Sequence, residues 1–111
     1  MAFGVTKTEL SRWKEKAKQG HVSFLTHFWY DTRFPQYKTV TKAACMNRET
    51  LIAWGKQYGL KEKWIHERDE FPHFDLIGDI EKEILIKEGC EQKLLRLENK
   101  VLSNIEDKNK K

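Results

Sequence analysis

The spacing of apolar residues changes along the chain, and each change predicts a different element. Between residues 6 and 20, apolar side chains recur at three- and four-residue intervals, which is the pattern of one helix face. The positions of this face are Leu10, Trp13 and Ala17. Thr6 and Glu9 form a capping box, and Gly20 supplies a left-handed stop. A first helix is therefore predicted over residues 6–20.

Residues 21–30 and 39–46 have the composition of β-strands. The first segment is rich in Val, Phe, Leu, Thr, Trp and Tyr. Its apolar run is nearly continuous, which indicates burial on both faces, so we expect it to be the central strand of the sheet. Pro35 breaks the loop that follows, and residues 39–46 are then predicted to form the second strand.

Three further helices are predicted in the second half of the chain. Asn47 caps a helix that ends at Gly59, and the next helix begins at residues 78–79 and ends at Gly89. A last helix covers residue 91 to about residue 107. Its apolar seam consists of Leu94, Leu97, Val101 and Ile105. This seam is short for a coiled coil, so it either packs on the domain or pairs with a second copy as a homodimer.

The stretch from Trp64 to Leu76 concentrates polar and aromatic side chains. Residues 64–68 are predicted to form a short strand, and Pro72 holds the chain extended before a second one. Residues 73–76 alternate polar and apolar side chains. In a strand, two polar residues then project from one face, and two apolar residues pack into the core from the other. The polar pair is His73 and Asp75, and the apolar pair is Phe74 and Leu76.

Together these elements predict an α+β fold, with a small three-stranded sheet covered by helices and a C-terminal helix. The length of 111 residues suits one compact domain. We expect residues 1–90 to form a single α+β domain. Residues 91–111 are expected to form the C-terminal helix and a basic tail.

Composition narrows the class of protein. The net charge is +4 with a pI near 9.1, which permits an acidic partner without requiring one. Two cysteines, with no CxxC spacing, exclude a disulfide framework and a zinc motif of that kind. No apolar run is long enough for a signal peptide or a membrane span, so a soluble cytoplasmic protein without a membrane partner is expected.

Two blocks of the sequence together carry a resemblance to a known family: residues 26–35, and residues 64–68 continuing to residues 72–76. With Met1-Ala2-Phe3-Gly4 and the turn at residues 57–60, the chain resembles the uncharacterised YneQ-like family of Bacillus over roughly residues 1–90. A looser likeness, over about residues 50–90, links it to a family of unknown function that is common in phage genomes. Neither resemblance supplies an activity. The family pattern nominates His27, Trp29, Asp31, Arg33, Trp64, His66, His73 and Asp75.

These residue types suit a ligand pocket for a nucleotide or a nucleic-acid end. Tryptophans can stack on a base, arginines can hold anionic oxygens, and His and Asp can bond to polar edges. The predicted ligand-binding residues are His27, Trp29, Asp31, Arg33, Trp64, His66, Arg68, His73 and Asp75. Phage-borne relatives extend the hypothesis to the capture of a nucleotide signal in phage–host conflict.

Two alternatives stay open, and so does the question whether the protein is an enzyme. The first is a metal-dependent phosphoesterase or nuclease, with a divalent metal held by His66, His73 and Asp75. The second is a protein-interaction module that dimerises through the C-terminal seam. Because unpatterned His and Asp are more often structural, His73 bonded to a backbone carbonyl is the ordinary interpretation to weigh against a site.

Overall fold

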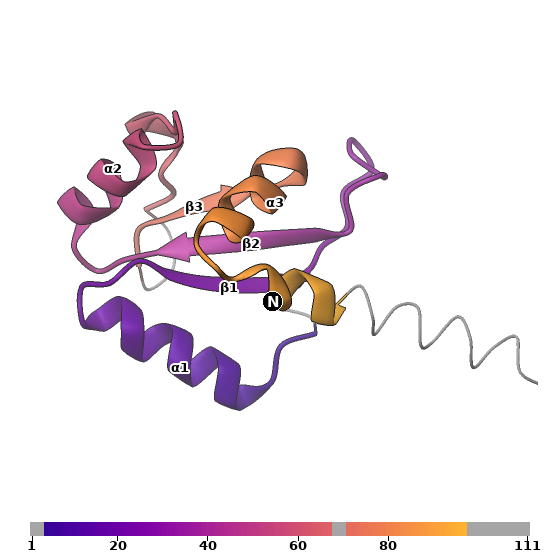
Figure 1. Cartoon of the computed structure of the whole chain (residues 1–111), viewed down its shortest axis with the longest axis horizontal. Coiled ribbons are helices and arrows are strands. Elements are labelled where there is room, and N and C mark those ends of the chain that lie inside the picture. The colour runs from indigo at the N-terminus through magenta and orange to yellow at the C-terminus, as the bar shows by residue number, and fades with distance from the viewer. Residues whose placement is uncertain (1–3, 68–70, 98–111) are drawn as a thin grey trace, which may run out of the picture.

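Three antiparallel strands form the sheet, in the order β1 (Ser23–Phe28), β2 (Thr39–Ala44) and β3 (His73–Leu76) (Figure 1). The computed structural model describes residues 4–67 and 71–97. With its helices, this sheet confirms the predicted α+β fold. The expectation that residues 21–30 form the central strand is wrong, because β2 lies between the other two. β1 is buried at the edge of the sheet because helices, rather than a further strand, cover it.

Helix α1 (Lys7–Lys18) lies alongside β1 (Figure 1). The predicted capping box is confirmed, since the Thr6 hydroxyl accepts from the Glu9 N–H at 3.1 Å and the Glu9 carboxylate accepts from the Thr6 N–H. Ala17 is fully buried in a small cluster with Trp13, Ala44 and Phe71. The Trp13 indole N–H donates to the Ser23 carbonyl at 3.1 Å, which ties the helix to the start of β1.

Helices α2 (Arg48–Lys56) and α3 (Gly78–Lys87) bury the larger hydrophobic core. The Asn47 side chain caps α2, as predicted, by accepting from the Thr50 N–H. Gly55 lets α2 approach β3, because a Cβ atom at this position would lie 2.7 Å from the Phe74 ring. The C-terminal ends of the two helices are also joined at Glu88, just after α3, whose carboxylate accepts from an indole of α2 and from a phenol in the turn that follows α2. These donors are Trp54 at 2.7 Å and Tyr58 at 2.8 Å.

A buried chain of hydroxyls crosses the sheet. Thr41 is fully buried and donates to Glu81 of α3 at 2.9 Å, while Thr39 donates to the same carboxylate at 2.8 Å. The hydroxyl of Thr26 lies 2.7 Å from that of Thr41. Because the one proton of Thr41 is directed to Glu81, Thr26 must be the donor to Thr41. β1, β2 and α3 are therefore linked by one ordered polar chain.

Between α2 and β3 the chain forms a short 3₁₀ helix, η1 (Glu62–Trp64), and residues 64–67, the described part of the strand predicted over residues 64–68, do not form a strand. Only a bridge from His66 to His73 pairs with β3 in the described part of this segment. The bridge consists of two backbone hydrogen bonds of 2.8 and 3.1 Å. The segment thus reaches the edge of β3 and leaves it again at once.

A further helix begins at Glu91 and continues to the end of the described residues at Leu97. Leu94 joins the main core, and Leu97 is almost fully buried beside Gly4. The first half of the predicted seam therefore packs within its own chain. Val101 and Ile105 lie outside the described residues, so dimerisation through all four positions stays a prediction. Among the described residues, no helix has the length and apolar character of a membrane span.

Candidate functional site

The strand register brings distant polar residues onto one face of the sheet. Lys42 of β2 lies opposite Asp75 of β3, and Val40 lies opposite His27 of β1. As the alternation predicted, Asp75 is exposed, whereas Phe74 and Leu76 are buried in the core. The polar block after β1 and the polar block at β3 therefore meet in space, although some forty residues separate them in the sequence.

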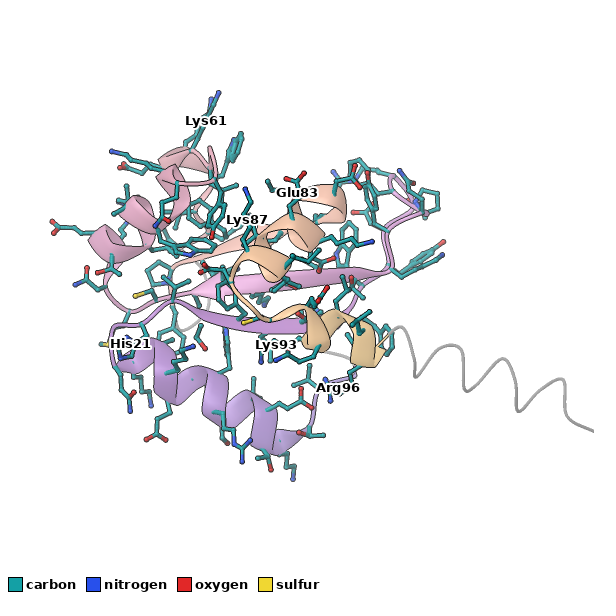
Figure 2. The ribbon with its side chains drawn as sticks, in the orientation of Figure 1. His21, Lys61, Glu83, Lys87, Lys93 and Arg96 are labelled. Atoms are coloured by element: carbon teal, nitrogen blue, oxygen red, sulfur yellow. The ribbon has the colours of Figure 1, made fainter. Side chains whose placement is uncertain are left out.

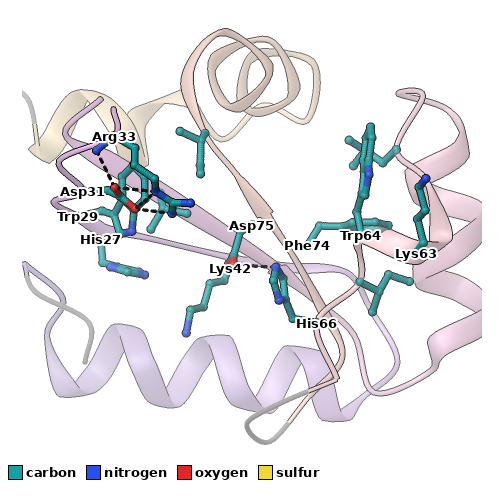
Figure 3. Close-up of a pocket in the computed structure, with 14 residues that line it drawn as sticks. His27, Trp29, Asp31, Arg33, Lys42, Lys63, Trp64, His66, Phe74 and Asp75 are labelled. Carbon is teal, nitrogen blue, oxygen red and sulfur yellow. Dashed lines mark hydrogen bonds and ion pairs between the residues drawn. The ribbon is translucent and has the colours of Figure 1, made fainter. Parts of the chain in front are cut away.

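This face opens into a cleft of about 660 Å³ that extends to the edge of β3. Seven of the nine predicted ligand-binding residues line the cleft: His27, Trp29, Asp31, Arg33, Trp64, His66 and Asp75. Figure 3 shows the loop that follows β1 at one end, Trp64 and Lys63 at the other, and the contact between His66 and Asp75 between them. The volume lies within the range of small-molecule sites, roughly 300–1,000 Å³.

An aspartate–arginine pair forms one end of the cleft. The Arg33 Nε donates to both carboxylate oxygens of Asp31, at 3.0 and 3.2 Å, and Nη2 donates at 2.6 Å. The backbone N–H of Arg33 donates to the same carboxylate at 2.9 Å. The hydrogen bonds from Arg33 lower the pKa of Asp31 to about 2, so the carboxylate stays ionised at neutral pH.

Aromatic side chains support this loop. Trp29 stacks on Phe34 with ring centroids 6.4 Å apart, and Phe34 stacks on Tyr37 at 6.1 Å. Tyr37 in turn lies against Gly78 at the start of α3, where a Cβ atom would be 2.8 Å from the phenol ring. The row of rings therefore anchors the Asp31–Arg33 pair to the folded core.

Two imidazoles flank Asp75 in the middle of the cleft. His66 Nε2 lies 3.2 Å from one carboxylate oxygen, and His73 Nε2 lies 3.6 Å from the other. The two rings stack with centroids 5.4 Å apart. His73 is only 4% exposed, lies outside the cleft lining, and has its Nδ1 3.0 Å from the Phe71 carbonyl oxygen. His66 therefore lines the cleft, whereas His73 lies buried behind it, against the ring of His66.

His27 is buried and incompletely bonded. Its Nδ1 lies 2.9 Å from the Phe28 carbonyl oxygen, and a carbonyl only accepts, so Nδ1 carries the proton of the neutral ring. The buried Nε2 has no hydrogen-bond partner in the structure. Burial lowers the pKa of His27, although the bond to Phe28 opposes this shift. The ring is therefore a neutral acceptor at the wall of the cleft.

The far end of the cleft is aromatic and cationic. Trp64 is 47% exposed, which is unusual for so large an apolar side chain, and the Lys61 ammonium lies 5.7 Å from its ring centroid. Lys63 joins Trp64 in the lining, and sequence reasoning missed it. A lysine in a polar connecting segment gives no signal of its own. Only the η1 turn shows which side of the segment faces the sheet.

The metal alternative gains no geometric support. Residues 4–67 and 71–97 contain no group of three His, Cys, Asp or Glu side chains placed to hold a metal ion. The trio of His66, His73 and Asp75 is arranged as a carboxylate between two imidazoles, with His73 turned towards a backbone carbonyl. The metal-dependent enzyme stays a prediction. Arg68, the ninth predicted ligand-binding residue, lies outside the described residues.

Comparison with known proteins identifies one relative over most of the chain. The uncharacterised protein YneQ of Bacillus subtilis strain 168 is 54% identical over 96 residues, which are 86% of this chain and 97% of the relative. No protein-family model matches the chain, so the looser likeness to a phage-borne family finds no support there. No solved structure matches it either. The relative's description names no ligand or activity.

Proposed function

The chain belongs to the YneQ-like family, and within this uncharacterised family we propose that the cleft binds a nucleotide or the end of a nucleic acid. The observation that carries the proposal is the convergence of seven predicted residues on one cavity of about 660 Å³, with an indole and a cation at each end. A nucleotide needs both a flat apolar surface for its base and cations for its phosphates.

The cations of the cleft come from three separate elements. Arg33 follows β1, Lys42 lies on β2, and Lys63 lies in η1. Arg33 binds Asp31 through Nε and Nη2, so the Nη1 edge of its fixed guanidinium can donate to a phosphate oxygen. Asp31 thus positions the arginine. The spread of cations along the cleft suits an extended phosphate-bearing ligand better than a single small anion.

The aromatic groups supply the second part of the recognition. Trp64 is exposed at the rim and can stack on a base, an interaction worth about 1–3 kcal/mol per base. Trp29 is held by its stack on Phe34, so it offers a fixed surface at the other end. Between them, the His66–Asp75 pair supplies polar atoms for a ribose hydroxyl or a base edge. The groups that would stack on a base and those that would bond to its polar atoms therefore line the same cleft.

A direct test is titration with a panel of nucleoside monophosphates and triphosphates. Binding is followed by calorimetry and by the indole N–H signals of the tryptophans in nuclear magnetic resonance spectra. We expect the signals of Trp29 and Trp64 to move. We expect Arg33→Gln and Lys63→Gln each to weaken binding roughly tenfold, the cost of one charge-assisted hydrogen bond.

Two exposed residues outside the cleft provide matched controls. Arg48→Gln removes the same kind of charge, and Tyr30→Leu removes an aromatic ring that is 74% exposed. Both variants should bind like the unmodified protein. The cleft is the wrong site if Arg33→Gln and Lys63→Gln leave the affinity unchanged while all variants stay folded. Native mass spectra would favour the metal-dependent alternative if they showed a metal-sized increment that His66→Ala removes.

A further inference from the structure

A second cavity, of about 170 Å³, lies on the opposite edge of the sheet from the cleft. It is bounded by α1, by the outer edge of β1 and by the helix that begins at Glu91. Figure 2 shows Lys93 and Arg96 on that helix, on the side that faces α1. We call this cavity the basic pocket. Its charged lining residues are Glu9, Arg12, Lys16, Lys93 and Arg96.

The charges of the basic pocket do not balance. Arg96 is neutralised by Glu9 through two hydrogen bonds of 2.5 and 2.6 Å. Burial alone would raise the pKa of Glu9, but the bonds from Arg96 and Thr6 outweigh it, so the pKa is lowered and the carboxylate is ionised. Arg12, Lys16 and Lys93 make no ion pair with any residue in 4–67 or 71–97. Three cations thus share one small cavity without a counter-charge from the described chain.

The spacing of these cations follows from the helices that carry them. Arg12 and Lys16 are four residues apart on α1, and Lys93 and Arg96 are three apart on the last helix, so each pair shares a helix face. Lys93 is only partly exposed. Like charges at such spacing destabilise a helix slightly, and partial burial adds to the cost of an unpaired ammonium. An anion in the pocket would offset both costs.

The floor of the pocket adds hydrogen-bond donors. The N–H of Trp29 donates to the carbonyl of Lys38, just before β2. Along a strand of an antiparallel pair, the backbone N–H groups alternately point towards the partner strand and away from it. By this alternation the N–H groups of Phe24 and Thr26 point away from β2, towards the outer edge. Both residues line the basic pocket. An anion there would receive backbone donors from below and charged donors from both helices.

We propose that the basic pocket binds a terminal phosphoryl group, as the dianion of inorganic phosphate or of a phosphomonoester. The volume is below the roughly 300 Å³ at which small-molecule sites begin, so the pocket suits a phosphoryl group better than a whole nucleotide. Three unpaired cations match a dianion better than the single charge of a phosphodiester. Guanidinium and ammonium donors on two walls suit the tetrahedral arrangement of phosphate oxygens.

The pocket contains its own reporter. The indole of Trp13 lines it and donates to the Ser23 carbonyl, so its N–H signal should respond to an anion bound nearby. We would titrate the full chain with inorganic phosphate at constant ionic strength and follow the indole and amide signals. We expect saturable shifts for Trp13, Phe24 and Thr26. Shifts confined to Trp29 and Trp64 would overturn the proposal.

Charge-removing variants make the test specific. Lys93→Gln and Arg12→Gln should each weaken phosphate binding roughly tenfold. Lys18→Gln removes the same charge from α1 but outside the basic pocket, so it should have no effect. An equal effect of all three variants would show non-specific attraction and overturn the proposal.

The source of the phosphoryl group is decided by comparing ligands. Single-stranded oligonucleotides with and without a 5′-phosphate are titrated against the same Trp13 signal. Tighter binding of the phosphorylated strand than of inorganic phosphate would identify a nucleic-acid end. Equal affinity for the two would identify a small phosphomonoester. Equal binding of both oligonucleotides would show recognition of the phosphodiester backbone and overturn the proposal.

Discussion

Replacing Thr41 with valine tests the buried hydroxyl chain that joins β1, β2 and α3. Valine has nearly the shape of threonine, so the change removes hydrogen bonds without opening a cavity. Thr41 is 0% exposed, donates to Glu81 at 2.9 Å and accepts from Thr26 at 2.7 Å. A hydrogen bond to a charged group contributes about 1.5–3 kcal/mol, and a neutral one about 0.5–1.5 kcal/mol. We expect Thr41→Val to lower the free energy of unfolding by about 2–4 kcal/mol.

The matched variant is Thr26→Val on the neighbouring strand. This change removes the first donor of the chain but leaves the bond from Thr41 to Glu81 intact, so its cost should be about 1 kcal/mol. Urea denaturation of both single variants and of the double variant gives the coupling energy. The double variant should cost less than the sum, because both single changes remove the same bond. Equal costs for the two single variants would refute the assigned direction of the hydrogen bonds, and strict additivity would refute the bond between the two hydroxyls.

Three other changes test the packing and the titration of the fold. Gly55→Ala should gain about 1 kcal/mol of helix propensity but lose about 1–3 kcal/mol to overpacking against Phe74. Thermal unfolding should show that Gly55→Ala destabilises the unmodified protein. In a Phe74→Leu background, the same change should be stabilising. Glu88→Ala should cost about 1–2 kcal/mol because it removes the acceptor of Trp54 and Tyr58, whereas exposed Glu83→Ala should be neutral. His27 has a folded-state pKa below its ordinary 6.5, so the unfolded state binds the proton more readily. Stability should therefore fall as pH drops below 6.5, and His27→Gln should flatten this part of the profile measured by urea denaturation.

Local patterns in the sequence predicted the elements well where short-range chemistry decides them. The capping box at Thr6 and the cap at Asn47 are both present, because each needs only the next few residues. The alternation predicted the exposure of Asp75 and the burial of Phe74 and Leu76 correctly, but His73, expected on the open face, is buried. The predicted central position of β1 in the sheet was wrong for a different reason. Burial on both faces does not distinguish a strand between two strands from an edge strand covered by helices.

The site shows the same division between local and long-range information. Seven of the nine predicted residues meet in the cleft because the strand register sets Lys42 opposite Asp75 and brings the two polar blocks together. His73 was predicted to face a ligand, but its ring is buried, stacks on the ring of His66 and bonds to the Phe71 carbonyl. The basic pocket could not be predicted. Its cations lie on helices some eighty residues apart, and only the packing of Leu94 into the core brings them together.

The two proposed sites use different physics, and salt should separate them. Phosphate in the basic pocket would be held by charges and hydrogen-bond donors alone, so its affinity must fall steeply as ions screen those charges. The cleft combines its cations with the exposed ring of Trp64, and stacking is insensitive to screening. A nucleotide that shifts Trp64 at high salt while the shift of Trp13 disappears would place the base in the cleft and leave the pocket to phosphate alone. If both signals vanished together, stacking would contribute nothing, and the argument for a nucleotide over a simple anion would fail.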